Sequence, residues 1–417
     1  QASLVCKNAK NGEIVAMVGG YDFHTNKFNN ATQGLRQTGS AYKPYVYTAA
    51  IEWGMTPEMP VSGAPIRRGG WSPQNYDGSH SHGTVPLKTA LAKSYNVAAV
   101  HLLEQVGVQT GAQMVRRFGI THPMSPNLAS ALGASEVPLV EMVSAYSAFP
   151  NRGIRVEPHL IRKVINNDGN VLEQWENTTY KVTSEYVALT MVELMRGVTQ
   201  AGGTATGANA AGHPVAGKTG TVNDHTDVWF IGYTPTYVTG IWMGNPERKE
   251  SLGRGMTGGQ GALPYFSAFM SQFMKDKKRE TFPDAPPMPA DIKALNEQRS
   301  REELEKREEE SLAVGSRVYT GTRRGKSDGD LEFSVDTDIK SDSNAPATLE
   351  RDTLPGSKRD DDEPPPPKSS VEIKPATNLP KKPDTPAPKT DKPASDDSRP
   401  RTVEPPKKQG KKGNDEP

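Results

Sequence analysis

The chain has 417 residues, enough for two or three domains at roughly 150 residues each, but its composition is uneven along its length. The last 77 residues, 341–417, hold 16 of the 35 prolines and no aromatic residue, so they cannot bury enough apolar surface to offset their chain entropy. A net charge of +1 excludes a broad cationic field for nucleic acid, and the single cysteine, Cys6, excludes an intrachain disulfide or a cysteine-based zinc site.

The chain opens with a predicted β-hairpin. Apolar runs at residues 4–6 and 14–18 flank Asn11-Gly12, a pair that accepts the positive φ angles of a tight turn. From Ser40 onward the apolar residues recur at helical spacing, with a proline in the first turn and a glycine at the end. We therefore expect two strands and then a buried helix that begins at Ser40.

The rest of the folded region alternates between helical and strand patterns. Residues 86–150 predict several helices between Gly and Pro breaks, which would form a helical subdomain. The pair Asp168-Gly169 predicts a second hairpin, and a helix is expected after Ser184. Three strands and a closing helix are expected last, at residues 215–222, 228–233, 237–243 and 262–275. This order predicts an α/β fold with one mainly antiparallel five-stranded sheet and flanking helices.

The folded domain is expected to span residues 1–283. Residues 284–345 are typical of a charged connector, and residues 346–417 of a disordered tail rich in Pro, Lys and Asp. Removal of everything beyond about residue 284 is therefore expected to leave the melting temperature unchanged. No signal-peptide pattern, initiator Met or long apolar run is present, so the sequence suggests an excised piece of a protein whose membrane anchor lies elsewhere.

The segment Ser40-Ala41-Tyr42-Lys43 is the first pattern that carries chemistry. A hydroxyl and an amine three residues apart share one face of a helical turn, within hydrogen-bond reach of each other. A neutral Lys43 could take the Ser40 proton during attack on a carbonyl, while the Ser40 N–H helps to hold the oxyanion. Roughly one or two such matches arise by chance in a chain this long, so the pattern alone favours a helix-capping serine beside a solvated lysine.

Two further patterns change that balance. Ser94-Tyr95-Asn96 would project a hydroxyl and a carboxamide from a turn between two helices. Lys218-Thr219-Gly220-Thr221 lies in a predicted strand that could pair with an extended peptide, with hydroxyls and an ammonium beside the peptide's carboxylate. The glycine permits a close approach to the strand backbone. The Lys-Thr-Gly triplet is expected by chance only about 0.1 times in a chain this size.

The ordered set Ser-x-x-Lys, Ser-x-Asn and Lys-Thr-Gly is typical of penicillin-binding proteins and class A β-lactamases. Over about residues 3–275, the sequence resembles the transpeptidase domain of class A, bifunctional penicillin-binding proteins. The resemblance extends to four further segments, at residues 12–20, 36–44, 131–137 and 229–235. It implies the fold shared by serine β-lactamases and penicillin-binding transpeptidases, with no cofactor and no metal.

The resemblance implies that Ser40 is the acylated nucleophile, that Lys43 is its base and that Ser94 relays the proton towards the leaving amine. The implied substrate is the D-Ala-D-Ala end of a peptidoglycan stem peptide. It is acylated with loss of the terminal D-Ala and then transferred to an amine on a neighbouring stem. Covalent binding of penicillin and other β-lactams is implied as well.

The remaining matched residues are implied to bind the substrate. Asn96 would hold the substrate amide, and Lys218 would provide catalytic positive charge near the carboxylate. Thr219 and Thr221, on either side of Gly220, would bind the carboxylate, and the Thr221 N–H would complete the oxyanion hole. The implied location is the extracytoplasmic side of the bacterial plasma membrane, where the longer family members are anchored.

Two departures from related patterns limit the function. The middle motif is Ser-Tyr-Asn rather than the Ser-Asp-Asn of class A β-lactamases, and the nearest candidate for a deacylating base, Glu173, is better explained as surface charge. The glycosyltransferase domain of the bifunctional family is absent from this sequence, so only cross-linking chemistry is expected. DD-carboxypeptidase activity and a β-lactam-sensing receptor remain alternatives, and the tail could be an arm that binds the wall or other wall-synthesis proteins.

Some patterns are explained better by structure than by function. The segment 253–258 fits the letters of a dinucleotide fingerprint, but without a βαβ unit it indicates a turn at the sheet edge. His80 and His82 lack a third metal ligand and are expected in a loop beside the cleft. Three aromatic residues could wall the substrate groove or pack in the core: Trp71, Tyr76 and Tyr95.

Overall fold

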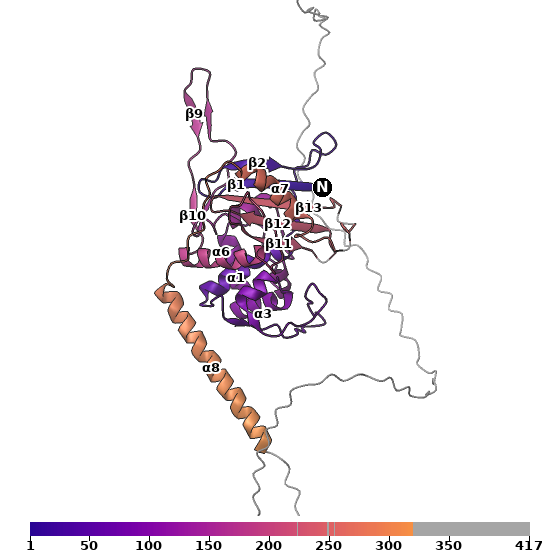
Figure 1. Cartoon of the computed structure of the whole chain (residues 1–417), viewed down its shortest axis with the longest axis vertical. Helices are drawn as coiled ribbons and strands as arrows, with labels where there is room; N and C mark the ends of the chain where they lie inside the picture. Colours follow the sequence, from indigo (N-terminus) through magenta and orange to yellow (C-terminus); the bar gives the residue numbers. More distant parts are fainter. Residues whose placement is uncertain (223, 248–249, 254, 320–417) are drawn as a thin grey trace, which may run out of the picture. The chain divides into compact units, whose positions relative to one another are not determined.

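The computed structural model describes residues 1–319 apart from 223, 248–249 and 254. A central sheet with helices on both faces forms the folded domain (Figure 1). The tail expected at 346–417, and the part of the expected connector beyond residue 319, lie outside the described residues.

The central sheet joins the first hairpin to three strands from the far end of the domain, in the order β11-β12-β13-β1-β2. Its strands are β1 (Ala2–Asn8), β2 (Ile14–Val18), β11 (Ala216–Thr221), β12 (Asp227–Tyr233) and β13 (Tyr237–Gly244). Every neighbouring pair is antiparallel. Gly12 forms the turn of the first hairpin at a φ of 84°, a conformation that favours glycine. The five-stranded antiparallel sheet predicted from the sequence is confirmed.

Helices pack against both faces of this sheet. The helices of the domain are α1 (Lys43–Glu52), α2 (Leu87–Ala92), α3 (Asn96–Val106), α4 (Val108–Arg117), α5 (Leu139–Tyr146), α6 (Glu185–Thr199) and α7 (Ala262–Met274), with the 3-10 helices η1 (Gly39–Tyr42) and η2 (Leu128–Leu132). A side chain on Gly232 would strike Phe266 of α7, and one on Gly240 would strike Val143 of α5. Gly240 pairs with Ile231, so these two residues point to the same face of the sheet, and Gly232, the next residue after Ile231, points to the other. α5 and α7 therefore lie on opposite faces of the sheet.

In the described part of the chain, four short strand pairs lie outside the central sheet. They are β3 (Arg36–Gln37) with β6 (Glu136–Val137), β4 (Pro60–Val61) with β5 (Val85–Pro86), β7 (Ile154–Val156) with β10 (Thr179–Lys181), and β8 (Lys163–Ile165) with β9 (Val171–Gln174). The β8–β9 hairpin projects from the domain at the upper left of Figure 1, and all its strand residues are exposed. Its turn is the predicted Asp168-Gly169, and Glu173 lies on its surface, as expected.

The segment after residue 283 continues into a helix, α8 (Ala290–Tyr319), whose first turns contact the domain. Ile292 is buried in the hydrophobic core, and the Asn296 side chain donates to the Gly54 carbonyl at 2.6 Å. The Arg299 guanidinium lies 3.5 Å from the centre of the Trp53 ring. The start of the expected connector is therefore anchored at the C-terminal end of α1.

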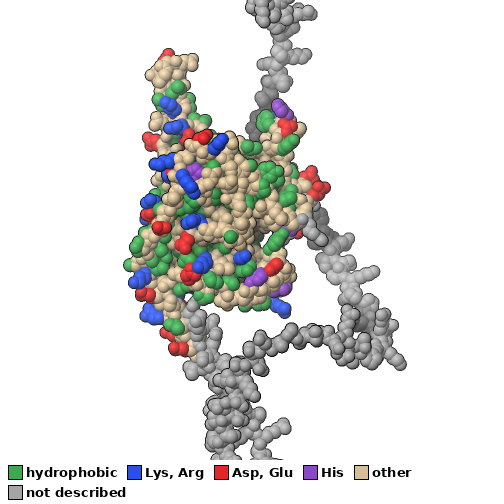
Figure 2. All heavy atoms as spheres, viewed as in Figure 1, with side chains coloured by type: hydrophobic (Ala, Val, Ile, Leu, Met, Phe, Trp, Pro, Cys, Tyr) green, Lys and Arg blue, Asp and Glu red, His purple; other side chains and the backbone are tan. Residues whose placement is uncertain are grey.

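The surface that Figure 2 shows carries positive and negative side chains interspersed, in agreement with the net charge of +1. Among the helices of the described residues, none combines the length and the apolar character needed to cross a lipid bilayer.

Candidate active site

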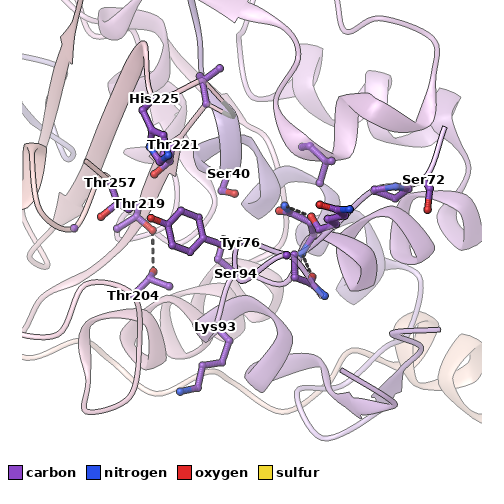
Figure 3. A pocket seen from close by; sticks show the side chains of 18 of the residues that line it. Ser40, Ser72, Tyr76, Lys93, Ser94, Thr204, Thr219, Thr221, His225 and Thr257 are labelled. Carbon is purple, nitrogen blue, oxygen red and sulfur yellow. Dashed lines mark hydrogen bonds between the residues drawn. The ribbon is translucent and has the colours of Figure 1, made fainter. Parts of the chain in front are cut away.

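Ser40 lies in η1, in the 3-10 turn that leads directly into α1, and its side chain lines a cavity of about 700 Å³. Figure 3 shows the labelled side chains around this cavity, with Ser40 near Ser94 and with Thr219 and Thr221 on the β11 side. Asn96 also lines the cavity. The structure thus brings together three motifs that lie up to 181 residues apart, from Ser40 to Thr221.

Lys43 is fully buried beneath the cavity and is held from the α2–α3 side. Its amine donates to the Ser94 carbonyl and to Asn96 Oδ1, both at 2.7 Å, and reaches Ser94 Oγ at 3.3 Å. The Ser40 hydroxyl has no hydrogen bond within the described part of the chain. The Ser40–Lys43 hydrogen bond that the spacing suggests is therefore not formed here, because the amine is turned towards Ser94 and Asn96.

Ser94 occupies the turn between α2 and α3 with a φ of 58°, a left-handed conformation that is unusual for a residue other than glycine. Such a conformation costs on the order of 1–3 kcal/mol and persists where surrounding contacts enforce it. Lys218 donates to Ser94 Oγ at 2.9 Å, so two lysine amines converge on this one hydroxyl. Ser94 is therefore placed to exchange a proton with either amine.

Burial makes both lysines unusually weak bases for their type. The pKa of Lys43 lies well below its ordinary value of 10.5, first because burial disfavours the ammonium and second because Lys218 is nearby. Burial lowers the pKa of Lys218 to about 7. A neutral amine beside the serines is thus accessible near neutral pH, as general-base chemistry requires.

β11 packs backbone to backbone against the turn that carries Ser40. A Cβ on Gly220 would lie 2.5 Å from the Thr38 carbonyl oxygen, and a Cβ on Gly39 would lie 2.4 Å from the Thr221 carbonyl oxygen. The close approach that the sequence predicted at Gly220 is therefore made by the chain's own turn that carries Ser40. This packing sets Thr221 beside the turn that carries Ser40.

Hydroxyl groups surround the cavity end of β11. Thr219 Oγ1 and Thr204 Oγ1 share a hydrogen bond of 2.8 Å, and Thr221 Oγ1 accepts from the Gly258 N–H at 3.1 Å. Thr204 lines the same cavity and carried no recognisable signal in the sequence, because a single threonine after a glycine pair is common in loops. This group can hold a carboxylate through hydroxyl donors.

The loop at residues 71–83 is a second support of the site that sequence reasoning missed. The buried Asn75 accepts with Oδ1 from the backbone N–H groups of Asn96 at 2.8 Å and Val97 at 3.2 Å. It therefore caps the N-terminus of α3 from outside the helix. The Asn96 amide donates to the Gln74 carbonyl at 2.8 Å, which leaves Asn96 Oδ1 facing Lys43. The loop thus fixes the orientation of the Asn96 carboxamide.

Two of the three candidate aromatic residues line the cavity. Trp71 and Tyr76 form part of its wall. The Tyr76 ring packs edge to face against the ring of His225, which also lines the cavity, with 6.2 Å between ring centroids. Tyr95 does not line the cavity and instead stacks on His82, with 4.1 Å between ring centroids. His82 belongs to the loop flanking the cleft, as expected. Within the described residues, no group of three or more His, Cys, Asp or Glu side chains could hold a metal ion.

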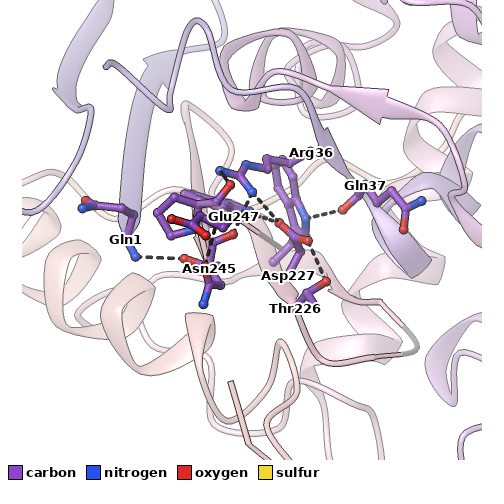
Figure 4. A network of polar contacts seen from close by, with 11 residues as sticks. Gln1, Arg36, Gln37, Thr226, Asp227, Asn245 and Glu247 are labelled. Carbon is purple, nitrogen blue, oxygen red and sulfur yellow. Dashed lines mark hydrogen bonds and ion pairs between the residues drawn. The ribbon is translucent and has the colours of Figure 1, made fainter. Parts of the chain in front are cut away.

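A buried polar network anchors the segment just before Ser40 (Figure 4). Arg36 forms an ion pair with Asp227 at 3.9 Å, and its guanidinium lies 4.5 Å from the centre of the Trp242 ring. The Trp229 indole donates to the Gln37 carbonyl at 2.8 Å. These contacts tie the turn that carries Ser40 to β12 and β13, so the turn and the sheet are positioned together.

Comparison with known proteins places this geometry in one family. The model of the penicillin-binding protein transpeptidase domain matches residues 2–270. Penicillin-binding protein 1A of Neisseria gonorrhoeae is 39% identical over 292 residues, which cover 67% of this chain and 36% of that protein. Penicillin-binding protein 1A of Aquifex aeolicus is 36% identical over 293 residues, which cover 69% of this chain and 40% of that protein. The chain thus spans well under half the length of these relatives.

Solved structures show the same likeness. Penicillin-binding protein 1A from Haemophilus influenzae matches with a TM-score of 0.65 and 28% identity, over 68% of this chain and 49% of that one. PonA1 from Mycobacterium tuberculosis, in complex with penicillin V, matches with a TM-score of 0.61 and 29% identity, over 69% of this chain and 84% of that one.

Proposed function

Because the chain belongs to the transpeptidase-domain family of penicillin-binding proteins, we propose that it is a serine D-Ala-D-Ala transpeptidase that forms an acyl-enzyme on Ser40. One observation carries this proposal: two buried lysine amines converge on Ser94 beside the cavity that Ser40 lines. The substrate is the D-Ala-D-Ala end of a peptidoglycan stem peptide, and β-lactams acylate the same serine.

In the acylation step, Ser40 Oγ bonds to the carbonyl carbon of the penultimate D-Ala. The Ser40 proton passes to neutral Lys43, whose pKa is lowered by burial. The carbon–nitrogen bond to the terminal D-Ala then breaks, and the proton reaches the leaving amine through Ser94, which contacts both lysines. The N–H groups of Ser40 and Thr221 hold the oxyanion, and Asn96 holds the substrate amide.

The substrate carboxylate is held at the β11 side of the cavity. Thr219 and Thr221 supply hydroxyls, and Lys218 supplies positive charge when it is protonated. Supporting this assignment, the threonines line the cavity, and the buried Lys218 amine donates to the Thr219 carbonyl at 3.1 Å and to Thr219 Oγ1 at 3.4 Å. We further propose that the protein acts on the extracytoplasmic side of the bacterial plasma membrane, where this substrate occurs, as part of a bifunctional cell-wall synthase.

The test is intact-mass analysis after incubation with a penicillin, followed by peptide mapping. A stable penicilloyl adduct on Ser40 is expected, because none of the described residues that line the cavity carries a carboxylate to activate water for deacylation. An adduct on another serine would overturn the assignment of the nucleophile. An adduct that disappears within seconds would identify a β-lactamase instead.

A further inference from the structure

A second cavity, of about 570 Å³, lies between α2 and α6, and we call it the α2–α6 groove. Lys93 lines both this groove and the cavity that contains Ser40. Figure 3 shows the Lys93 side chain running away from Ser40 and Ser94. Its amine lies 3.6 Å from the position that a Cβ on Gly202, in the groove wall, would occupy. The two cavities are therefore neighbours across this one side chain.

A second connection between the groove and the cavity is formed by the loop at residues 203–204. Gly203 lines the α2–α6 groove and Thr204, the next residue, lines the catalytic cavity, where its hydroxyl is bonded to Thr219 at 2.8 Å. The Thr204 N–H donates to the Ala92 carbonyl at 3.2 Å, which fixes this wall to α2. The groove therefore begins at the side of the catalytic cavity where the substrate carboxylate is proposed to lie.

The charges of the groove favour an anionic ligand. Lys93 and Arg196 are exposed, and within the described part of the chain neither side chain has an ion-pair partner. Lys88 also lines the groove but is paired with Glu58 at 2.5 Å. Among the described residues that line the groove, Glu193 is the one acidic side chain that opposes these cations. A ligand carboxylate would therefore meet two uncommitted positive charges.

The direction of the groove matches the second half of the proposed reaction. Attack of an amine on the acyl-enzyme is the chemical reverse of expulsion of the leaving amine. Both steps therefore pass through the same kind of transition state, and the nitrogen lies on the same side of the acyl carbon in both. The D-Ala leaving group lies on the side of Thr219 and Thr221. An acceptor peptide that enters from this side and continues past Thr204 and Lys93 would lie in the groove.

We propose that the α2–α6 groove binds the acceptor peptide of the transpeptidase reaction, and this inference rests on the function proposed above. The amine of this peptide attacks the acyl-enzyme, and its chain carries a carboxylate that Lys93 and Arg196 hold. In this step the amine nitrogen bonds to the acyl carbon and the bond from that carbon to Ser40 Oγ breaks. The proton that the amine loses returns to Ser40 Oγ through Ser94. The groove orients the acceptor and so favours transfer over hydrolysis.

The experiment compares acyl transfer to a peptide acceptor with hydrolysis of the acyl-enzyme, using the whole protein. A peptide thioester serves as the donor, and two C-terminally amidated peptides, Gly-Ala-Glu and Gly-Ala-Gln, serve as matched acceptors. In Arg196→Glu, the apparent KM for the Glu acceptor should rise tenfold or more, while the KM for the Gln acceptor changes less than twofold. Lys163→Glu, which reverses an exposed charge on the β8–β9 hairpin, is the matched control and should change neither value.

The rate of Ser40 acylation by a fluorescent penicillin is measured in the same variants. A Glu-acceptor KM within twofold of the wild-type value overturns the proposal, as does an equal rise for both acceptors. If Arg196→Glu also slowed acylation of Ser40, Arg196 would act on binding of the donor substrate, and this result would also overturn the proposal. If the unaltered protein is not acylated on Ser40 at all, the proposed function itself fails.

Discussion

The fold removes two lysines from water in different places: Lys7 on β1, and Lys43 below the cavity that Ser40 lines. Lys7 donates to Ser147 Oγ at 2.8 Å and to the Val156 carbonyl at 2.6 Å, and burial lowers its pKa to about 7. Burial likewise lowers the pKa of Lys43. The difference lies in the surroundings, because Lys7 has no contact with the cavity that Ser40 lines. A lowered lysine pKa therefore reports burial, and only its combination with an accessible serine indicates a catalytic base.

The sharpest test of this comparison is Lys43→Arg. The guanidinium keeps the positive charge but cannot give up its proton, so acylation of Ser40 by a fluorescent penicillin should fall about a thousandfold. Melting curves provide the folding control. A near-normal acylation rate in a folded variant would show that Lys43 is not the base.

The support given by the 71–83 loop should matter next most. Asn75→Ala removes the cap of α3 and should slow acylation by roughly ten- to a hundredfold, because Asn96 and Lys43 lose their alignment. Asn75→Asp keeps an acceptor oxygen and should restore most of the rate. The matched control is Asn151→Ala, which removes an exposed side-chain bond to the Ile154 carbonyl. Equal rates for the Ala and Asp variants of Asn75 would rule out this positioning role.

The pH profile separates the roles proposed for Lys43 and Lys218. Acylation should fall as pH drops below the lowered pKa of Lys43, because the base becomes protonated. It should also fall as pH rises through the Lys218 pKa of about 7, because positive charge at the carboxylate site is lost. Lys218→Arg stays charged, so it should keep much of the activity and lose this alkaline decline. An unchanged alkaline decline in the variant would contradict the role given to Lys218.

Lys7→Met should have the smallest effect on catalysis and a measurable effect on stability. Between about pH 7 and 10.5 the unfolded chain holds a proton on Lys7 that the folded chain lacks, so stability rises with pH in this window. The substitution should remove about 1.4 kcal/mol per pH unit of that rise, measured by urea unfolding at pH 7 and 9. Acylation should stay within twofold of the wild-type rate. A catalytic loss as large as that of Lys43→Arg would erase the distinction between the two regions.

The sequence was sufficient for the sheet and for the three motifs because both have local signals. Alternation and turn residues mark the strands, and short spacings mark Ser40 with Lys43 and Ser94 with Asn96. Asn75 and Thr204 lie in loops without a periodic pattern, so their contacts emerge only when distant segments meet. The anchoring of Ile292 was missed for a related reason, since one apolar residue in a charged segment predicts no packing. The Arg36–Asp227 ion pair likewise joins residues that local patterns cannot relate.

The reciprocal contact of Gly39 and Gly220 has a consequence for the tolerance of the site to mutation. Each glycine leaves room for a carbonyl oxygen of the other segment, from Thr221 and Thr38 respectively, and Gly39 also holds a φ of 52°. An alanine at either position would push β11 and the serine turn apart. In a saturation-mutagenesis scan, these two positions should therefore be as intolerant as Ser40 itself. Under the proposed function, substitutions that slow acylation by a penicillin without abolishing it should arise instead among other residues that line the cavity, such as Tyr76 and His225.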